Sequence, residues 1–269
     1  MIHILSMIKD EQRYLDAWIE YHLNIGVDKF VLYEDYSSSP HDVSKWGDKV
    51  VLLRIPDCFN EEEMAKFKDH MFRQCIVYEH YSRTLRKECE WFAYIDVDEY
   101  IEADNVHDVV DGCENFDQVM MMYKYYTYSG HLKDPHPGEA YSLRDTYTWF
   151  SYRRSYRGII PHLYIYWKCF YRSKWNHEDE DENTEFKMIP HSIWKIESYH
   201  TYISDIQLGH YYTKSFEEYV NGLYNVGVQD NNLRMNRRLE DFFHYNLVPV
   251  EEELIKEYAG KVVKVNEDY

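Results

Sequence analysis

The sequence lacks the motifs and runs that mark several common protein classes. It contains neither G-x-G-x-x-G nor G-x-x-x-x-G-K-S/T, so it signals neither a dinucleotide-binding fold nor a P-loop. No window approaches the ~20 apolar residues of a membrane span. The apolar run at Ile2–Ile8 ends too soon for a signal peptide. The sequence therefore predicts a cytoplasmic protein without a transmembrane segment.

Basic residues are scarce relative to acidic ones. The chain has 30 Lys and Arg residues against 48 Asp and Glu residues, a formal net charge of −18. This balance argues against a nucleic-acid partner, whose binding surface would be basic. It also argues against an anionic membrane surface as the main partner, although a local basic patch leaves peripheral membrane association open. Any anionic ligand needs a bound cation or a few well-placed Lys and Arg side chains.

Cysteine pairs are absent as well. The five cysteines include no C-x-x-C pair, and their number is odd. This pattern favours buried free thiols in a reducing compartment over a disulfide framework.

The most informative stretch that is present is Trp91–Glu102, WFAYIDVDEYIE. An apolar run of strand length predicts a central strand covered on both faces. Asp96 and Asp98 follow it, and in an extended segment side chains two residues apart project to the same side. Two carboxylates that close favour a divalent cation between them. In the same extended geometry Glu99 points the other way, which indicates a carboxylate that supports the metal ligands from behind or a structural one. A solvated acidic loop is the alternative.

The first hundred residues alternate between predicted strands and helices. Strands are predicted over Ile2–Ile8, Lys29–Tyr33, Lys49–Ile55 and the run from Trp91, with one helix before Gly26 and another from Glu61 to about Glu90. This rhythm is typical of a nucleotide-binding α/β half. In such sheets ligands gather at the carboxyl ends of the strands, where polar residues stand in this chain.

The second half is predicted more coarsely. Strands are expected over Gln118–Thr127 and Leu163–Tyr171, a loop over Ser129–Gly138, and a helix from Ser215. The acidic run Trp175–Glu185 favours a solvated loop over a second metal site.

Three stretches together resemble glycosyltransferases of the family 2 and family 92 (DUF23-like) type. They are K-D-E-x-x-Y-L-x-x-W-I-E-Y-H-x-x-x-G-V from Lys9, FVLYEDYSS from Phe30, and WFAYIDVDEYI from Trp91. The resemblance implies a GT-A fold, a Rossmann-like mixed sheet flanked by helices. We expect a catalytic domain over 1–214, divided into a nucleotide-binding half, 1–101, and an acceptor half, 102–214. A helical C-terminal extension is expected over 215–269.

The resemblance also implies a nucleotide-sugar donor, UDP-sugar first, whose diphosphate is held by Mn²⁺ or Mg²⁺ on a D-x-D motif. By position, Asp96 would lie near the ribose and the metal, and Asp98 would bind the metal. The loop Met7–Glu11, including Met7, Lys9 and Glu11, together with Asp35, would hold the nucleoside. The chain departs from relatives that read K-N-E where it has Lys9-Asp10-Glu11, which affects the expected nucleobase contacts.

The segment HYYTKS, from His210 to Ser215, adds chemistry of its own. It offers a neutral imidazole to a metal and an ammonium to a phosphate, four residues apart. By its place in the resemblance, His210 is the third predicted metal ligand and Lys214 the predicted diphosphate contact. The alternative for His210 is that it is one of 14 ordinary histidines.

An inverting transfer also needs a base and an acceptor site. The base removes the proton of the acceptor hydroxyl. His191 is the first candidate and Asp205 the second, although a structural role explains His191 as well. Tyr128, Gly130 and His131 are predicted to contact a glycan or glycolipid acceptor.

Three functions fit the sequence to different degrees. The leading hypothesis is a metal-dependent glycosyltransferase of glycan biosynthesis. A nucleotidyltransferase or metal-dependent phosphodiesterase on a similar sheet is the second. A non-catalytic carbohydrate-binding protein is the third, because the 28 tyrosines could stack on sugar rings. Such a protein would not need a D-x-D motif after a buried strand.

Overall fold

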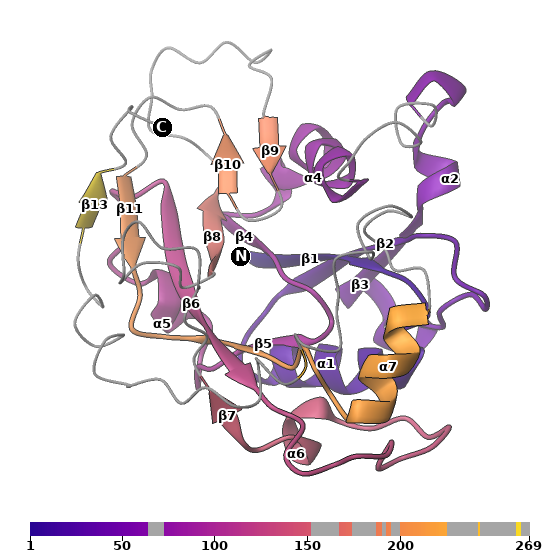
Figure 1. The fold of residues 1–269 in the computed structure, drawn as a ribbon. Helices are drawn as coiled ribbons and strands as arrows, with labels where there is room; N and C mark the ends of the chain where they lie inside the picture. The colour runs from indigo at the N-terminus through magenta and orange to yellow at the C-terminus, as the bar shows by residue number, and fades with distance from the viewer. Residues whose placement is uncertain are drawn as a thin grey trace.

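The structure is a computed structural model of the chain. It describes residues 1–63, 73–151, 167–173, 187–189, 192–194, 200–224, 242 and 262–264. Figure 1 shows an α/β fold in which helices lie on both sides of a central sheet.

The core of the sheet consists of four parallel strands in the order β4-β1-β2-β3. These are β1 (Ile2–Ile8), β2 (Lys29–Glu34), β3 (Val50–Arg54) and β4 (Trp91–Tyr94). All seven residues of β1 are buried, which agrees with a strand covered on both faces. The carboxyl ends of these strands therefore meet at one edge, as expected from the sequence.

The sheet continues beyond β4 in the order β8, β6, β11 and β13. The strands are β6 (Gln118–Tyr126), β8 (Trp167–Arg172), β11 (His200–Ile203) and β13 (Val262–Lys264). β8 runs antiparallel to both β4 and β6, so the sheet is mixed. Three short strands join its side: β5 (Glu99–Ile101), β7 (Phe150–Ser151) and β12 (Leu208–His210). β9 (Lys187–Ile189) and β10 (Ser192–Trp194) form a separate two-stranded ribbon.

A hydrophobic cluster lies on each face of the parallel strands. On one face, β1 contributes Ile2 and Ile4 to the cluster that includes Trp18 of α1 (Gln12–Asn24). On the other face, Leu5 packs with Tyr78 of α4 (Arg73–Thr84). Alternating side chains of one strand thus face two helical layers. This arrangement confirms the predicted α/β class with a mixed sheet flanked by helices.

Helix α1 holds the segment that follows β4. It ends where predicted, with Gly26 at φ 97° and Val27 N–H donating to the His22 carbonyl at 3.0 Å. Trp18 Nε1 donates to the Glu99 carbonyl at 2.7 Å, and Tyr21 Oη donates to the Ile101 carbonyl at 2.6 Å. Side chains of α1 therefore hold β5 in place through hydrogen bonds to the β5 backbone.

The second predicted helix covers two described helical segments, residues 61–63 and α4. Its start is confirmed, because Asn60 Oδ1 accepts from Glu63 N–H at 3.0 Å while Glu63 Oε2 accepts from Asn60 N–H at 2.9 Å. Its end lies at Thr84, and a 3₁₀ turn, η2 (Arg86–Glu88), replaces the last turn predicted toward Glu90.

The remaining elements are short, apart from α7 (Phe216–Tyr224). They are η1 (Ser44–Lys49), α2 (Ile55–Cys58), α5 (His107–Val110) and α6 (Leu143–Thr146). α7 confirms the helix predicted after Ser215, whereas Val262–Lys264 of the same extension is an edge strand antiparallel to β11. No helix in the part of the chain that the structure describes is long and apolar enough to cross a membrane.

Candidate functional site

The carboxylates after β4 lie in a turn rather than in an extended strand. Glu99 N–H donates to the Asp96 carbonyl at 2.9 Å, which closes the turn over residues 96–99. Asp96 N–H in return donates to Glu99 Oε2 at 2.8 Å. The expectation that Glu99 points away in an extended chain is therefore wrong, because the turn brings its carboxylate back to Asp96.

A buried lysine, which the sequence did not single out, contacts this turn. Lys168 of β8 is 2% exposed, and its Nζ lies 3.2 Å from Asp96 Oδ2 and 3.4 Å from Glu99 Oε2. Burial lowers the pKa of Lys168, but the two carboxylates outweigh this and raise it above its usual value. Burial raises the pKa of Glu99 to about 8, and Lys168 opposes that rise. An internal ammonium thus compensates the acidic turn.

The Asp98 carboxylate lies near two other predicted site residues, the metal ligand His210 and the diphosphate contact Lys214. Its Oδ1 lies 3.6 Å from His210 Nε2, and its Oδ2 lies 3.3 Å from Lys214 Nζ. Strand β12 brings these residues there, since it pairs antiparallel with β5 and places His210 opposite Glu99. Tyr211 N–H also donates to the Asp98 carbonyl at 2.8 Å. The structure therefore brings together Asp98, His210 and Lys214 across more than a hundred residues of sequence.

Burial governs the protonation of the two groups beside Asp98. It lowers the pKa of His210 to about 4, so the imidazole is neutral at physiological pH and can donate a lone pair. Burial and then the charge of Asp98 raise the pKa of Glu11 to about 8. Within the described part of the chain, Glu11 Oε2 and His210 Nδ1 are buried without a hydrogen-bond partner. Each of these two atoms can therefore still form a hydrogen bond.

The donor set at Asp98 fits a metal in part. The described residues include no group of three or more His, Cys, Asp or Glu side chains that could hold an ion as they stand. Asp98 and His210 are 3.6 Å apart. Two ligands about 2.1 Å from one octahedral ion are about 3 Å apart at right angles and about 4 Å apart when opposite. The observed separation lies between these two values, so a small shift of either side chain would let the pair hold one ion, whereas Asp96 contacts Lys168 and Gln74 instead.

Backbone strain gathers at the strand ends around the site. Four residues other than glycine have positive φ among those described: Asp10, Tyr36, Ser129 and Lys214. They follow β1, β2, β6 and β12 by two to four residues. Such conformations cost about 1–3 kcal/mol each and persist where surrounding contacts over-determine them, often at functional sites.

A buried histidine joins the loops after β1 and β2. His41 Nε2 accepts from Glu11 N–H at 3.0 Å, so its Nδ1 carries the proton and donates to Glu34 Oε1 at 2.7 Å. Asp35, which is fully buried, donates its N–H to the Ile8 carbonyl at 2.9 Å. The predicted nucleoside loops are thus held together, through a histidine that no sequence motif indicated.

Other predicted residues lie apart from these contacts. The Met7 side chain is 2% exposed in the core on the α4 side, which leaves only its backbone for a ligand. Lys9 is half-buried after β1. Asp205 is exposed between β11 and β12, and its carboxylate makes none of the contacts that join Asp98, His210 and Lys214. His191 lies outside the described residues.

The predicted acceptor residues lie in the loop after β6. Phe216 N–H donates to the His131 carbonyl at 3.2 Å, so this loop caps the start of α7. The His131 ring meets Tyr147 edge-on, and the Tyr128 ring meets Phe242. Gly130, at φ 82°, lies under the Trp149 ring, where an added Cβ would be 3.6 Å away. Trp149 itself is 59% exposed.

Comparison with known proteins finds partial matches. No family model matches the chain. A glycosyltransferase family 92 protein of Ricinus communis is 28% identical over 116 residues, 42% of this chain and 19% of that protein. Another family 92 protein, of Oryza sativa subsp. japonica, is 26% identical over 113 residues, 42% of this chain and 18% of that protein. The match thus spans about a fifth of these relatives and supports the resemblance to glycosyltransferases.

Solved structures give weaker likenesses. The galactosyltransferase LgtC in complex with donor and acceptor sugar analogs has a TM-score of 0.29 and 16% identity, over 45% of this chain and 46% of that one. S. aureus TarS 1–349 has a TM-score of 0.31 and 12% identity, over 64% of this chain and 47% of that one. Neither likeness bears on the substrates of this chain.

Proposed function

We propose that this chain is a metal-dependent glycosyltransferase with a GT-A fold. It would move a sugar, with inversion, from a nucleotide-sugar donor such as a UDP-sugar to a carbohydrate or glycoconjugate acceptor in the cytoplasm. The observation that carries the proposal is the group formed by Asp98, His210 and Lys214 beside the carboxyl end of a buried parallel strand. In open α/β sheets ligands bind at this edge.

The metal would be held by Asp98 and His210, with Asp96 as the third predicted ligand. When bound, Mn²⁺ or Mg²⁺ supplies positive charge that stabilises the leaving nucleoside diphosphate. Lys214 would donate to a phosphate oxygen. The buried Glu11 Oε2, which has no hydrogen-bond partner among the described residues, supports a ligand at this place.

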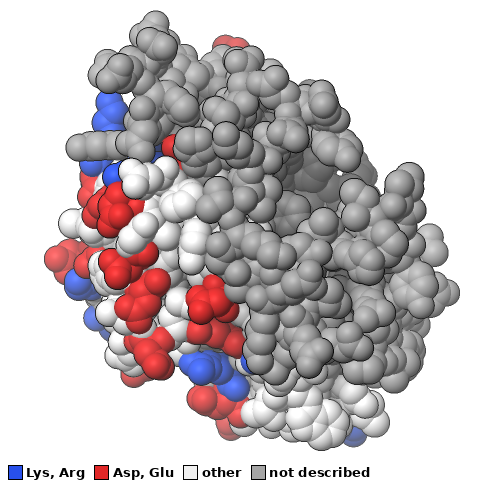
Figure 2. All heavy atoms as spheres, turned by 90° about the vertical axis from the view of Figure 1, so that its left-hand side faces the viewer, with Lys and Arg blue, Asp and Glu red and all other residues white. Residues whose placement is uncertain are grey.

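The surface charge of the molecule makes such cations necessary. Figure 2 shows acidic side chains spread over the described part of one face, in keeping with the net charge of −18. A nucleotide-sugar is itself an anion, so the negative electrostatic potential of the protein repels it. A bound metal and Lys214 would supply attraction at the site itself.

The nucleoside would lie over the loops that follow β1 and β2. His41 holds these loops to each other through Glu11 N–H and Glu34, which preorganises them without a ligand. Lys9, Glu11, Asp35 and the backbone at Met7 are the candidate contacts.

The reaction also needs a catalytic base and residues that bind the acceptor, and the chain has candidates for each. A base must take the proton of the attacking hydroxyl, and His191 and Asp205 stay the candidates for it. Tyr128, Gly130 and His131 stay the predicted acceptor contacts, and the exposed Trp149 over Gly130 offers a ring face to a sugar.

A thermal-shift panel of nucleoside diphosphates and nucleotide-sugars, each with MnCl₂ and with EDTA, tests the proposal. We expect UDP and UDP-sugars with Mn²⁺ to stabilise the protein by about 2–3 kcal/mol at a hundred times the dissociation constant, or several degrees. EDTA should remove most of this gain. Equal stabilisation with and without metal, or none by any nucleotide, would contradict the proposal. Release of UDP from a UDP-sugar then separates an enzyme from a binding protein.

A further inference from the structure

Lys214 stands at a strained position between β12 and α7. Its φ is 51°, a left-handed conformation that is unfavourable for a residue with a Cβ. Contacts on both sides hold it there. Before it, Tyr211 N–H is bonded to the Asp98 carbonyl, and after it Phe216 N–H is bonded to the His131 carbonyl. The backbone therefore aims this one side chain at the site.

The helix that follows Lys214 starts with a capping box. Glu218 N–H donates to Ser215 Oγ at 3.1 Å, and Ser215 N–H donates to Glu218 Oε2 at 3.2 Å. The Glu218 carboxylate is therefore part of the helix start, directly after Lys214.

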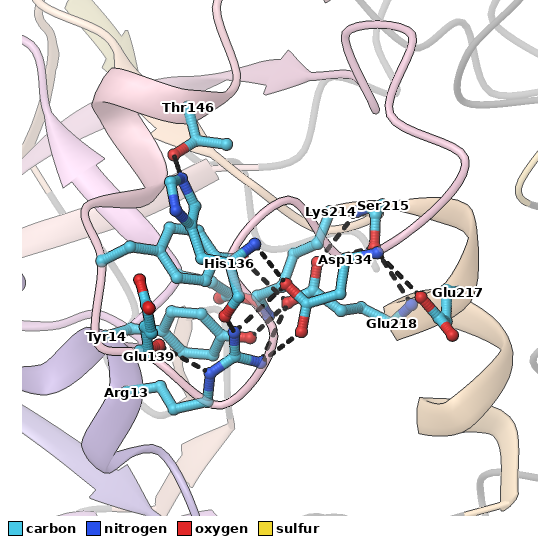
Figure 3. Close-up of polar contacts among 12 residues, drawn as sticks. Arg13, Tyr14, Asp134, His136, Glu139, Thr146, Lys214, Ser215, Glu217 and Glu218 are labelled. Carbon is cyan, nitrogen blue, oxygen red and sulfur yellow. Dashed lines mark hydrogen bonds and ion pairs between the residues drawn. The ribbon is translucent and has the colours of Figure 1, made fainter.

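The same carboxylate collects hydroxyl donors from the body of the protein (Figure 3). Tyr14 Oη donates to its Oε1 at 2.6 Å and Tyr141 Oη at 2.8 Å, while Tyr147 Oη donates to its Oε2 at 2.7 Å. Burial alone would raise the pKa of Glu218, but hydrogen bonds from Tyr14, Tyr147, Ser215 and Tyr141 lower it to about 2. Glu218 is thus a fixed anion at neutral pH.

Tyr14 contacts both Glu218 and Lys214. Its hydroxyl is bonded to Glu218, and its ring centroid lies 5.1 Å from Lys214 Nζ. The ammonium group therefore lies between the Asp98 carboxylate, 3.3 Å away, and the face of an aromatic ring. The same residue thus contacts the start of α7 through its hydroxyl and the ammonium group through its ring.

The neighbouring residue of α1 supports this arrangement. Arg13 forms an ion pair with Asp134 at 2.9 Å, and its Nε donates to the Glu139 carbonyl at 3.0 Å. Figure 3 shows Arg13 and Tyr14 side by side beneath the loop that carries Asp134 and beside the start of α7. The first turn of α1 thus joins the 134–139 loop, α7 and Lys214.

We propose that Tyr14 is a positioning residue for Lys214. A neutral ring holds an ammonium group without neutralising it, so the charge stays available to an anion. When Asp98 turns to a metal, Lys214 loses that partner, and the ring keeps it in place for the diphosphate. This inference rests on the proposed function only in assigning Lys214 to the donor, since the contact between the ring and Lys214 is independent of it.

Competitive labelling of lysines with acetic anhydride tests the contact without any ligand. Exposed Lys133 serves as the internal reference, and mass spectrometry gives the relative rate at Lys214. We expect Tyr14→Leu to raise that rate about fivefold, because the ring no longer covers the ammonium. Tyr14→Phe keeps the ring, so its rate should stay within about twofold of the wild type.

Tyr141→Phe is the matched control. It also removes one hydroxyl from Glu218, but it leaves the Tyr14 ring over Lys214, so labelling should again stay within about twofold. The same series is then measured by UDP titration with Mn²⁺, where Tyr14→Leu should weaken binding about fivefold and the two Phe variants should not.

Each possible result either supports or contradicts the positioning role of Tyr14. An unchanged Lys214 rate in Tyr14→Leu, or an equal rise in Tyr141→Phe, overturns the positioning role. If Tyr14→Leu does not fold, a raised rate in Tyr14→Phe overturns it, because the ring is still present. If the wild type binds no UDP while the labelling follows the expected pattern, the proposed function fails and the positioning role stands.

Discussion

Asp98→Asn is expected to lower glycosyl transfer about 1,000-fold while the protein stays folded. Asparagine keeps the shape of the side chain and a carbonyl oxygen for Lys214, but it removes the charge that the metal needs. Metal-assisted stabilisation of a leaving diphosphate contributes several kcal/mol, and each 1.4 kcal/mol is about tenfold in rate. Initial rates of UDP release from a UDP-sugar at saturating Mn²⁺ measure the effect.

Asp104→Asn is the control for this substitution. Asp104 is exposed six residues further along the chain and carries the same charge, so its loss should leave the rate unchanged. Circular dichroism and the melting temperature establish that both variants are folded. A folded Asp98→Asn variant with more than about a tenth of the wild-type rate would remove Asp98 from the metal site.

Lys168→Met is expected to have the largest effect on stability, lowering the free energy of unfolding by about 3 kcal/mol. The substitution leaves Glu99, which is 0% exposed, and Asp96 facing each other without the ammonium that now contacts both. Methionine fills a similar volume, so the loss is one of charge compensation more than of packing. Urea unfolding in EDTA at pH 9 measures it, because no metal can then replace the lysine and Glu99, whose pKa burial raises to about 8, is ionised beside Lys168 in the wild type.

The double variant Lys168→Met, Glu99→Gln separates this explanation from simple damage to the core. Removing both charges of a buried pair is often nearly neutral, whereas removing one partner is costly. We expect the second substitution to restore at least about half of the lost stability. A double variant as unstable as the sum of the two single ones would show that the ion pair does not account for the effect.

Local patterns predicted the parallel strands and the first helix, because each rests on short-range physics. The apolar run of β1, the left-handed Gly26 and the capping residue Asn60 can all be interpreted from a few neighbouring residues. The second predicted helix ends at Thr84 instead of about Glu90. After it, the Glu88 and Cys89 N–H groups donate to carbonyls three residues back, which forms a 3₁₀ turn.

The charge compensation at the site depends on pairings that no local pattern contains. Lys168 reaches Asp96 because β8 inserts antiparallel between β4 and β6, a register that only the complete sheet determines. The turn at Asp96 folds Glu99 back to the same lysine. Tyr14 belongs to the K-D-E-x-x-Y motif that resembles glycosyltransferases. Its role at Lys214, however, depends on a helix two hundred residues further along the chain. One signal in the sequence could have pointed to Lys168. It is the charged residue of the otherwise uncharged strand predicted over Leu163–Tyr171.

The most direct test of the account is an anomalous-difference map at the manganese edge, from crystals grown with UDP and MnCl₂. We expect one strong peak within about 2.5 Å of an Asp98 carboxylate oxygen and of His210 Nε2, in contact with the UDP diphosphate. Density for UDP with no manganese at Asp98, or a manganese ion bound elsewhere, would contradict it.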